Sequence, residues 1–379
     1  MRRRGSLVLL IVLAATTGSR GASAVVDCTS GVHRVPSANI GDFSENILGA
    51  VDVAGPDDVW AVGYMIGDGG ELFALADHWD GEAWTAELVP SPPSEFRVLL
   101  DVAAAGPDDV WAVGEWLQDE PYGPHPLVVH WDGSSWSVVP TPDPGGGLQG
   151  VTAIAPDDVW AVGHDSTESN LTMHWNGSSW SVVPAPRIGD RANFLTAVAG
   201  SATDDVWAVG FRFKSSSSSA TTTLHWDGAQ WRRVASPNGD MESSSLFGVA
   251  ADRSGKAWAV GDTGNGATGH PLILRWGGGA WKVVRDPPLS ERSAVLADVA
   301  IRGPGDVWAV GSRYNGRRWL TLVERWDGDR WSVVPSPSPS PDANELHGVA
   351  VEADSVWMVG TLRRLDLNAY RTLVLRACP

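Results

Sequence analysis

The chain has 379 residues, of which 43% are hydrophobic; 21 are tryptophan and only 2 are cysteine. This composition excludes an intrinsically disordered chain, and the cysteine count excludes a dense disulfide scaffold. With 28 basic and 45 acidic residues the formal net charge is −17, so we expect no sequence-independent binding to nucleic acid or to an anionic membrane.

The N-terminus has the pattern of a secretory signal peptide. Arg2, Arg3 and Arg4 precede the apolar run Leu7–Ala15, and small residues follow up to Ala24. A basic start, a short apolar run and small residues at the end are typical of a signal that is cleaved, here after Ala24. We therefore expect residues 1–24 to be removed and residues 25–379 to form a secreted, extracellular protein that does not insert into a membrane.

A sequence unit recurs seven times along the rest of the chain. Val-Trp or a close variant, followed by Ala-Val-Gly or a close variant, occurs at intervals of 47 to 51 residues, with tryptophans Trp60, Trp111, Trp160, Trp207, Trp258, Trp308 and Trp357. The first six copies also carry a tryptophan pair five residues apart: Trp79 and Trp84, Trp131 and Trp136, Trp175 and Trp180, Trp226 and Trp231, Trp276 and Trp281, and Trp326 and Trp331. A fixed period of this length predicts a repeat architecture.

Each copy is expected to form four short strands. In the second copy the first strand surrounds Val102, a turn follows at 106–109, and the second strand is 110–114. The third strand ends at Trp131, and the fourth runs from Trp136 to a terminating proline at 140. An Asp-Gly dipeptide between the last two strands favours a tight hairpin.

The repeat predicts the fold class. Seven antiparallel sheets with Val, Ala and Trp on both faces must pack on one another, because neither face suits water. A closed ring buries both faces of each sheet and leaves only short edges. We therefore predict an all-β fold, a seven-bladed β-propeller of four-stranded blades spanning residues 25–379, in which the repeat tryptophans are packing residues.

The two chain ends are expected to share the last blade. The seventh copy stops at Cys378-Pro379 without a fourth strand, and Val32–Pro36 aligns with the fourth strand of other copies. On this alignment Cys28 and Cys378 fall at the same missing hairpin turn, which predicts a disulfide between them in an exported protein.

The motifs Asp108–Gly114 and His130–Trp136 resemble tectonin-like repeats and similar propeller repeats of secreted bacterial proteins. This resemblance covers residues 28–379. It implies a propeller fold and a lectin-like function at bacterial surfaces.

Aromatic and basic side chains outside the repeat mark a candidate recognition face. The connections between strands two and three and between blades should lie on one face and vary in sequence, whereas the other face has repeated Pro-Asp-Asp and Trp-Asp-Gly turns. Binding sites usually occupy such variable loops. The candidate ligand-binding residues in these segments are Tyr64, Trp116, Tyr122, Tyr314, Arg317, Arg318, Trp319 and Tyr370. The alternative is that these rings only pack at strand ends.

The same face has an uneven charge distribution. Copies six and seven carry Arg313, Arg317, Arg318, Arg363, Arg364 and Arg371, and copies one and two carry acids that include Asp68, Asp77 and Glu115. The arginines could accept carboxylates or phosphates, or they could be ordinary solvated charges.

The central channel is a third candidate. Asp101 and Asp298 precede the repeat valine in two copies, and we assign His347 the equivalent place in a third. These side chains could hold a cation or water, but no dense metal-ligand motif supports a metal site. Catalytic motifs with characteristic spacing are missing from the sequence, and no cofactor is expected.

Two functions remain open. The first is a monomeric, non-enzymatic binding or scaffolding protein that recognises an extracellular glycan, cell-wall polymer or protein. The second is an extracellular polysaccharide hydrolase or lyase with Asp101 and Asp298 as catalytic residues at the channel mouth.

Overall fold

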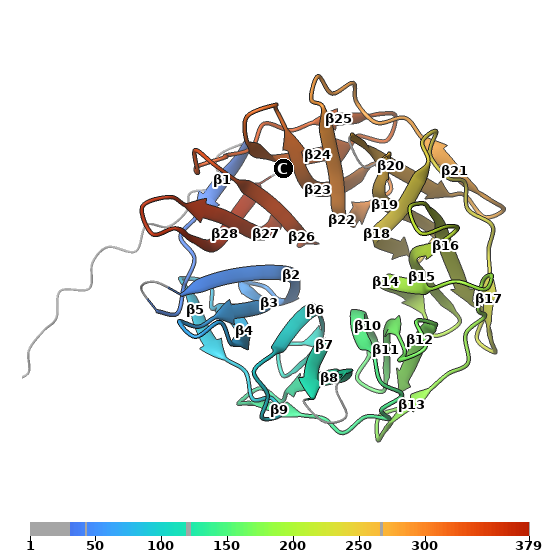
Figure 1. The fold of residues 1–379 in the computed structure, drawn as a ribbon, viewed down its shortest axis with the longest axis horizontal. Coiled ribbons are helices and arrows are strands. Elements are labelled where there is room, and N and C mark those ends of the chain that lie inside the picture. The colour runs from blue at the N-terminus through green and yellow to red at the C-terminus, as the bar shows by residue number, and fades with distance from the viewer. Residues whose placement is uncertain (1–30, 42–43, 119–122, 266–267, 379) are drawn as a thin grey trace, which may run out of the picture.

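The computed structural model describes residues 31–41, 44–118, 123–265 and 268–378, and in this part of the chain every regular element is a β-strand. The strands form seven four-stranded antiparallel sheets arranged as blades around a central axis (Figure 1). No helix among the described residues is long and apolar enough to cross a membrane. The predicted seven-bladed β-propeller is therefore confirmed.

The strands follow the sequence order from the axis outward in six of the seven blades. Blade 1 contains β2 (Glu45–Gly55), β3 (Asp58–Ile66), β4 (Leu72–Trp79) and β5 (Trp84–Leu88). Blade 2 contains β6 (Arg97–Gly106), β7 (Asp109–Gln118), β8 (Gly123–Trp131) and β9 (Trp136–Val138). Blade 3 contains β10 (Gly147–Ala155), β11 (Asp158–His164), β12 (Asn170–Trp175) and β13 (Trp180–Val182). Blade 4 contains β14 (Asn193–Ala202), β15 (Asp205–Phe213), β16 (Ser219–Trp226) and β17 (Trp231–Arg233).

Blade 5 contains β18 (Ser243–Asp252), β19 (Lys256–Gly264), β20 (Gly269–Trp276) and β21 (Trp281–Val284). Blade 6 contains β22 (Ser293–Gly303), β23 (Asp306–Tyr314), β24 (Trp319–Trp326) and β25 (Trp331–Val333). Blade 7 contains β26 (Asn344–Val351), β27 (Val356–Arg364), β28 (Ala369–Cys378) and, as its outer strand, the N-terminal β1 (Gly31–Val35).

The N-terminal strand closes the ring as predicted. β1 pairs antiparallel with β28, with Val32 opposite Ala377 and Gly31 opposite Cys378 (Figure 1). Residues 1–30 lie outside the described residues, and with them the signal peptide and Cys28. No described cysteine is free, but the bridge to Cys28 itself stays a prediction.

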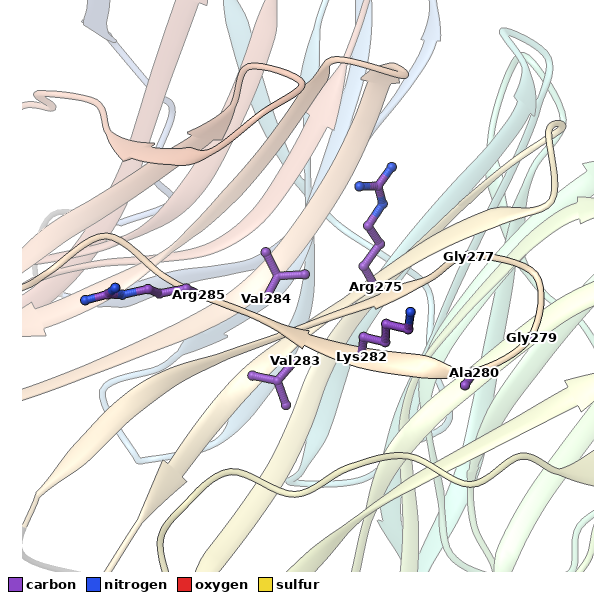
Figure 2. A pocket seen from close by; sticks show the side chains of 8 residues that line it. All are labelled: Arg275, Gly277, Gly279, Ala280, Lys282, Val283, Val284 and Arg285. Atoms are coloured by element: carbon purple, nitrogen blue, oxygen red, sulfur yellow. The ribbon is translucent and has the colours of Figure 1, made fainter.

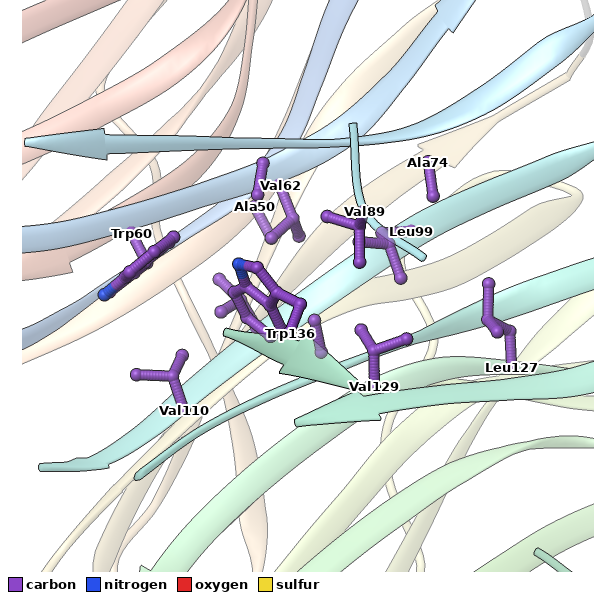
Figure 3. Packing of buried hydrophobic residues seen from close by; sticks show 13 residues of the cluster. Ala50, Trp60, Val62, Ala74, Val89, Leu99, Val110, Leu127, Val129 and Trp136 are labelled. Atoms are coloured by element: carbon purple, nitrogen blue, oxygen red, sulfur yellow. The ribbon is translucent and has the colours of Figure 1, made fainter. Parts of the chain in front are cut away.

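Tryptophan triads fill six of the seven blade interfaces. At the first, Trp60 of blade 1 packs on Trp131 and Trp136 of blade 2, with ring centroids 4.8 and 5.2 Å apart. Figure 3 shows Trp60 and Trp136 in this cluster beside Val110 and Val129. Trp111, Trp160, Trp207, Trp258 and Trp357 make the same contacts with the pairs of the next blades. The repeat tryptophans are thus packing residues.

A β-bulge in every innermost strand explains the repeat glycine. In blade 2 the register with β7 shifts between Leu99 and Asp101, so Leu100 is the extra residue. The bulge brings the inner strand over Gly114, where an added Cβ would lie 2.0 Å from the carbonyl oxygen of Val98. The other six repeat glycines face the same obstruction. Only glycine therefore fits at the end of the Val-Trp-Ala-Val-Gly motif.

Candidate functional site

The molecule has two faces with different connections. The turns between first and second strands and between third and fourth strands pack together: a Cβ added to Gly81 would meet the Cβ of Asp57 at 2.9 Å. We call this side the constant face. The opposite side, called the variable face, carries the connections between second and third strands and between blades, which also contact one another, as where Gly146 N–H donates to Pro124 O at 2.8 Å.

The predicted aromatic residues lie at the variable face but are distributed over four blades. Tyr314 and Trp319 are opposite each other in blade 6, with ring centroids 5.4 Å apart. Trp116 of blade 2 stacks on His125 at 4.9 Å. Tyr64 lies in blade 1 and Tyr370 in blade 7, and all five are half-buried. Tyr122 lies outside the described residues. The structure therefore brings together one pair of the predicted rings.

Three of the six arginines of the candidate basic arc are paired with acids among the described residues. Acids close to the arginines supply counter-charges: Arg313 pairs with Glu291, Arg363 with Asp342 and Arg364 with Asp366. Arg318 donates to the carbonyl of Ser340 at 2.7 Å and Arg371 to that of Gly41 at 2.9 Å. Arg317 is exposed in the turn beside Trp319. The acid-paired arginines thus fit the alternative of ordinary charges, and anion binding at the others stays a prediction.

Three clefts hollow the variable face, each lined by a second-to-third-strand connection and a blade-to-blade connection. The first, about 410 Å³, is lined by residues that include His125, Gly146, His164 and Glu168. The second, about 540 Å³, is lined by residues that include Arg34, Asn39, Arg364 and Arg371. The third, about 710 Å³, includes Asn238, His270 and Asp286. Trp116 supports the first cleft through its stacking on His125.

The central channel contains a small cavity to which every blade contributes. Its volume is about 130 Å³, below the roughly 300–1,000 Å³ of ordinary ligand pockets. The bulge residue of each innermost strand lines it: Gly49, Leu100, Gln149, Thr196, Phe247, Ala297 and His347. His347 is therefore equivalent to Leu100 and Ala297, and the predicted equivalence to Asp101 and Asp298 is off by one residue; Gly348 occupies that place.

The channel carboxylates join neighbouring blades. One oxygen of Asp101 accepts the N–H of Val102 at 2.9 Å and the other accepts that of Val151 in blade 3 at 2.8 Å. Asp298 bonds in the same way to Val299 and, across to blade 7, to Val349. Sequence reasoning missed a third carboxylate that joins two blades in this way, although it does not line the cavity: Asp52 accepts the N–H groups of Val53 and of Ala104 in blade 2.

Burial raises the pKa of all three channel carboxyls. The pKa of Asp52 rises to about 6 and that of Asp298 to about 7, and that of Asp101 rises well above its ordinary value, with repulsion from Asp298 and Asp52 adding to the effect of burial. His347 completes the set by donating from Nδ1 to Leu48 O of blade 1 at 2.9 Å. Because both oxygens of each carboxyl accept backbone N–H groups, the arrangement favours a structural role for Asp101 and Asp298. Among the described residues no group of three potential ligands could hold a metal ion.

The histidines of the third strands also belong to the scaffold. His78 bonds to Asp58 at 2.8 Å and stacks on Trp60 at 4.1 Å. His130, His174 and His225 make equivalent contacts to Asp109, Asp158 and Asp205. In blades 5, 6 and 7 an arginine lies over the repeat tryptophan instead. The periodic histidines are thus structural.

No family model matches the chain, and no curated protein matches it. Solved structures share its fold. A structure described as YCF48 bound to D1 peptide has a TM-score of 0.56 and 18% identity, over 92% of this chain and 96% of that chain. A polysaccharide lyase, an ulvan lyase, has a TM-score of 0.56 and 10% identity, over 90% and 95%. A protein of unknown function from Dyadobacter fermentans has a TM-score of 0.55 and 12% identity, over 92% and 100%. At these identities the likeness is one of fold.

Proposed function

We propose that the protein is an exported, non-enzymatic binding or scaffolding propeller that recognises a glycan, a cell-wall polymer or a protein through its variable face. The observation that carries this proposal is the position of the three clefts, all of which lie where the sequence departs from the repeat. A rigid ring that presents non-repeating connections on one side is the arrangement expected of a binding module.

Two further facts support binding over catalysis. The channel cavity, about 130 Å³, is smaller than ordinary ligand pockets. In Asp101 and Asp298 one oxygen accepts a backbone N–H of the same blade and the other accepts one of the next blade. Proteins of the same fold include one captured with a peptide and one that cleaves a polysaccharide, so the fold alone leaves the ligand open.

A binding screen of the mature protein tests the proposal. We expect glycan-array and pull-down signals that Trp116→Ala, Tyr314→Ala or Trp319→Ala weakens at least tenfold, because each removes an aromatic surface at the variable face. Val182→Ala is the control, since Val182 is 46% exposed on the outer strand of blade 3. Melting temperatures of all variants must match that of the wild type. Unchanged binding in all three aromatic variants, or turnover of a polysaccharide by the wild type, would refute the proposal.

A further inference from the structure

The hairpin turn between third and fourth strands is built the same way in five blades. The residue after the third-strand tryptophan accepts the N–H groups two and three positions later through its side-chain oxygen, at 2.8 to 3.1 Å. These residues are Asp80, Asp132, Asn176, Asp227 and Asp327. The two N–H groups stabilise a negative charge, since the bonds from Ala83 and Glu82 hold the pKa of Asp80 below its ordinary value.

Blade 5 has no carboxylate in this turn. Gly277 stands where the other blades have Asp or Asn, and the turn continues as Gly278-Gly279-Ala280. The N–H groups of Gly279 and Ala280 therefore lack the side-chain acceptor that their equivalents have. All four residues are exposed. An added Cβ on Gly278 would meet nothing within 4 Å, whereas the equivalent position in blades 1 to 4 lies against the preceding turn. Paired backbone N–H groups in an open turn are a typical anion-binding element.

A second acid is also missing from blade 5. In five other blades the first residue of the second strand is an Asp that bonds to the third-strand His or Arg. In blade 5 this residue is Lys256, and the third-strand residue is Arg275. Arg275 lies over the rings of Trp258 and Trp326, and no ion pair among the described residues involves it. The constant face, acidic elsewhere, is basic at this blade.

These features meet in one cavity. A cleft of about 750 Å³ is lined by Arg275, Lys282 and Arg285 together with Gly277, Gly279 and Ala280. Arg275 and Lys282 are cross-strand partners in the pairing of β20 with β21, so their side chains leave the same face of the sheet. Figure 2 shows both projecting on one side of the hairpin, with Arg285 beyond the end of β21.

We propose that this cleft, the blade 5 hairpin site, binds a carboxylate of an acidic polysaccharide, and that the carboxylate occupies the position of the missing Asp side chain. The N–H groups of Gly279 and Ala280 would donate to it as their equivalents donate to Asp132, and Arg275 and Lys282 supply the positive charge. The site begins at the constant face and extends along β21 to Arg285, which also lines the third cleft of the variable face. Its capped-turn chemistry does not rest on the binding proposed for the variable face.

The spacing of the cations favours a glycan over an acidic peptide. Arg275 and Lys282 form one cationic point. Arg285, just past the end of β21 and three residues after Lys282, is a second, roughly 10 Å away at the rise of an extended chain. Acidic side chains on one face of an extended peptide recur every second residue, roughly 7 Å apart. In a polyuronate the carboxylates are separated by whole sugar rings, which suits two separate cationic points.

Titration of the mature protein with oligogalacturonate tests the proposal, with neutral oligosaccharide of equal length and polyglutamate as comparison ligands. We expect galacturonate to bind, more weakly as salt rises. Gly277→Asp, which restores the acid of the other blades, should weaken binding at least tenfold, and Gly277→Asn, which caps the same N–H groups without charge, should also weaken it. Lys282→Ala and Arg275→His should each lower the affinity for galacturonate several-fold.

Matched controls separate this site from general charge effects and from the variable face. Gly277→Ala leaves the two N–H groups open and should bind like the wild type, and Gly277 is not in the left-handed region, so alanine causes no strain. Arg330→Ala removes an exposed cation from the blade 6 hairpin, and Trp319→Ala alters the variable face; both should bind normally. Failure of the wild type to bind galacturonate, equal binding by Gly277→Asp, or binding of polyglutamate in its place would overturn the proposal.

Discussion

The interface between blades 6 and 7 differs from the other six. Elsewhere a repeat tryptophan meets a tryptophan pair of the next blade, but Trp308 meets Val32 and Ala377, the residues that hold the pair's positions in blade 7. The two chain ends thus join where the aromatic packing is thinnest. The difference indicates that closure depends on strand pairing, on the hydrogen bonds between neighbouring blades beside the channel and on the predicted disulfide more than on ring contacts.

The largest expected effect concerns the covalent closure. If Cys28 and Cys378 are bridged, reduction opens a loop of about 350 residues, and the loop-entropy model gives a loss of about 5–6 kcal/mol in the free energy of unfolding. Denaturant unfolding with and without reductant measures it. Intact mass should rise by two hydrogens on reduction, and an unchanged mass would contradict the bridge.

A tryptophan substitution compares the two kinds of interface directly. Trp60→Ala should destabilise the protein by about 3–5 kcal/mol, because it leaves a cavity in a buried triad. The loss of stability in Trp308→Ala should be smaller than that in Trp60→Ala by about 1–3 kcal/mol. The reason is that Trp308 lacks two aromatic contacts worth about 0.5–1.5 kcal/mol each. Equal losses in chemical denaturation would show that the closure interface packs as firmly as the others.

Buried acids without partners should make the neighbouring blade interfaces sensitive to pH. Glu324 and Asp77 are fully buried at core positions where other blades have Leu, Val or Met, and neither has a hydrogen-bond partner among the described residues. Burial, with repulsion from Asp286, raises the pKa of Glu324 to about 8. The folded state therefore holds a proton that the unfolded state releases near pH 4.5, and stability falls as pH rises from about 5 to 8.

Glu324→Leu tests this effect. Replacing an unpartnered buried acid with the apolar residue of the other blades should stabilise the protein by about 1–3 kcal/mol at pH 8 and flatten the fall of melting temperature between pH 5 and 8. Melting curves across this range measure both. A variant as sensitive to pH as the wild type would contradict the role of Glu324.

The smallest expected effects concern the channel bonds. Asp298→Ala removes the bond to Val349 that joins blades 6 and 7, and Asp101→Ala removes the equivalent bond between blades 2 and 3. Each substitution should lower the free energy of unfolding by about 0.5–1.5 kcal/mol. The loss should be larger for Asp298→Ala, because the interface between blades 6 and 7 lacks a tryptophan triad. The reverse order in unfolding experiments would argue against a weak closure interface.

The architecture could be predicted from the sequence because the same unit recurs in every blade. The period of the tryptophans predicts the blades, and the alignment of Val32–Pro36 predicts the closing strand. The positions of single side chains could not be predicted in the same way. A β-bulge shifts side chains by one position, and no residue type marks it in the sequence, so His347 was aligned with Asp101 instead of with Leu100. The partners of Asp101 are backbone groups of another blade, and the counter-ions of Arg313 and Arg363 lie 21 to 22 residues away. Gly277 could have been found, because it breaks a pattern that the other copies keep.

Amide hydrogen exchange of the native mature protein is the most direct test of a ring closed by its own N-terminus. Because Val32–Val35 pair with β28 inside blade 7, we expect amides that are hydrogen-bonded in this short segment to be protected to the same degree as those of β5, the outer strand of blade 1. Exchange of residues 32–35 at the rate of an unstructured peptide would contradict the closure.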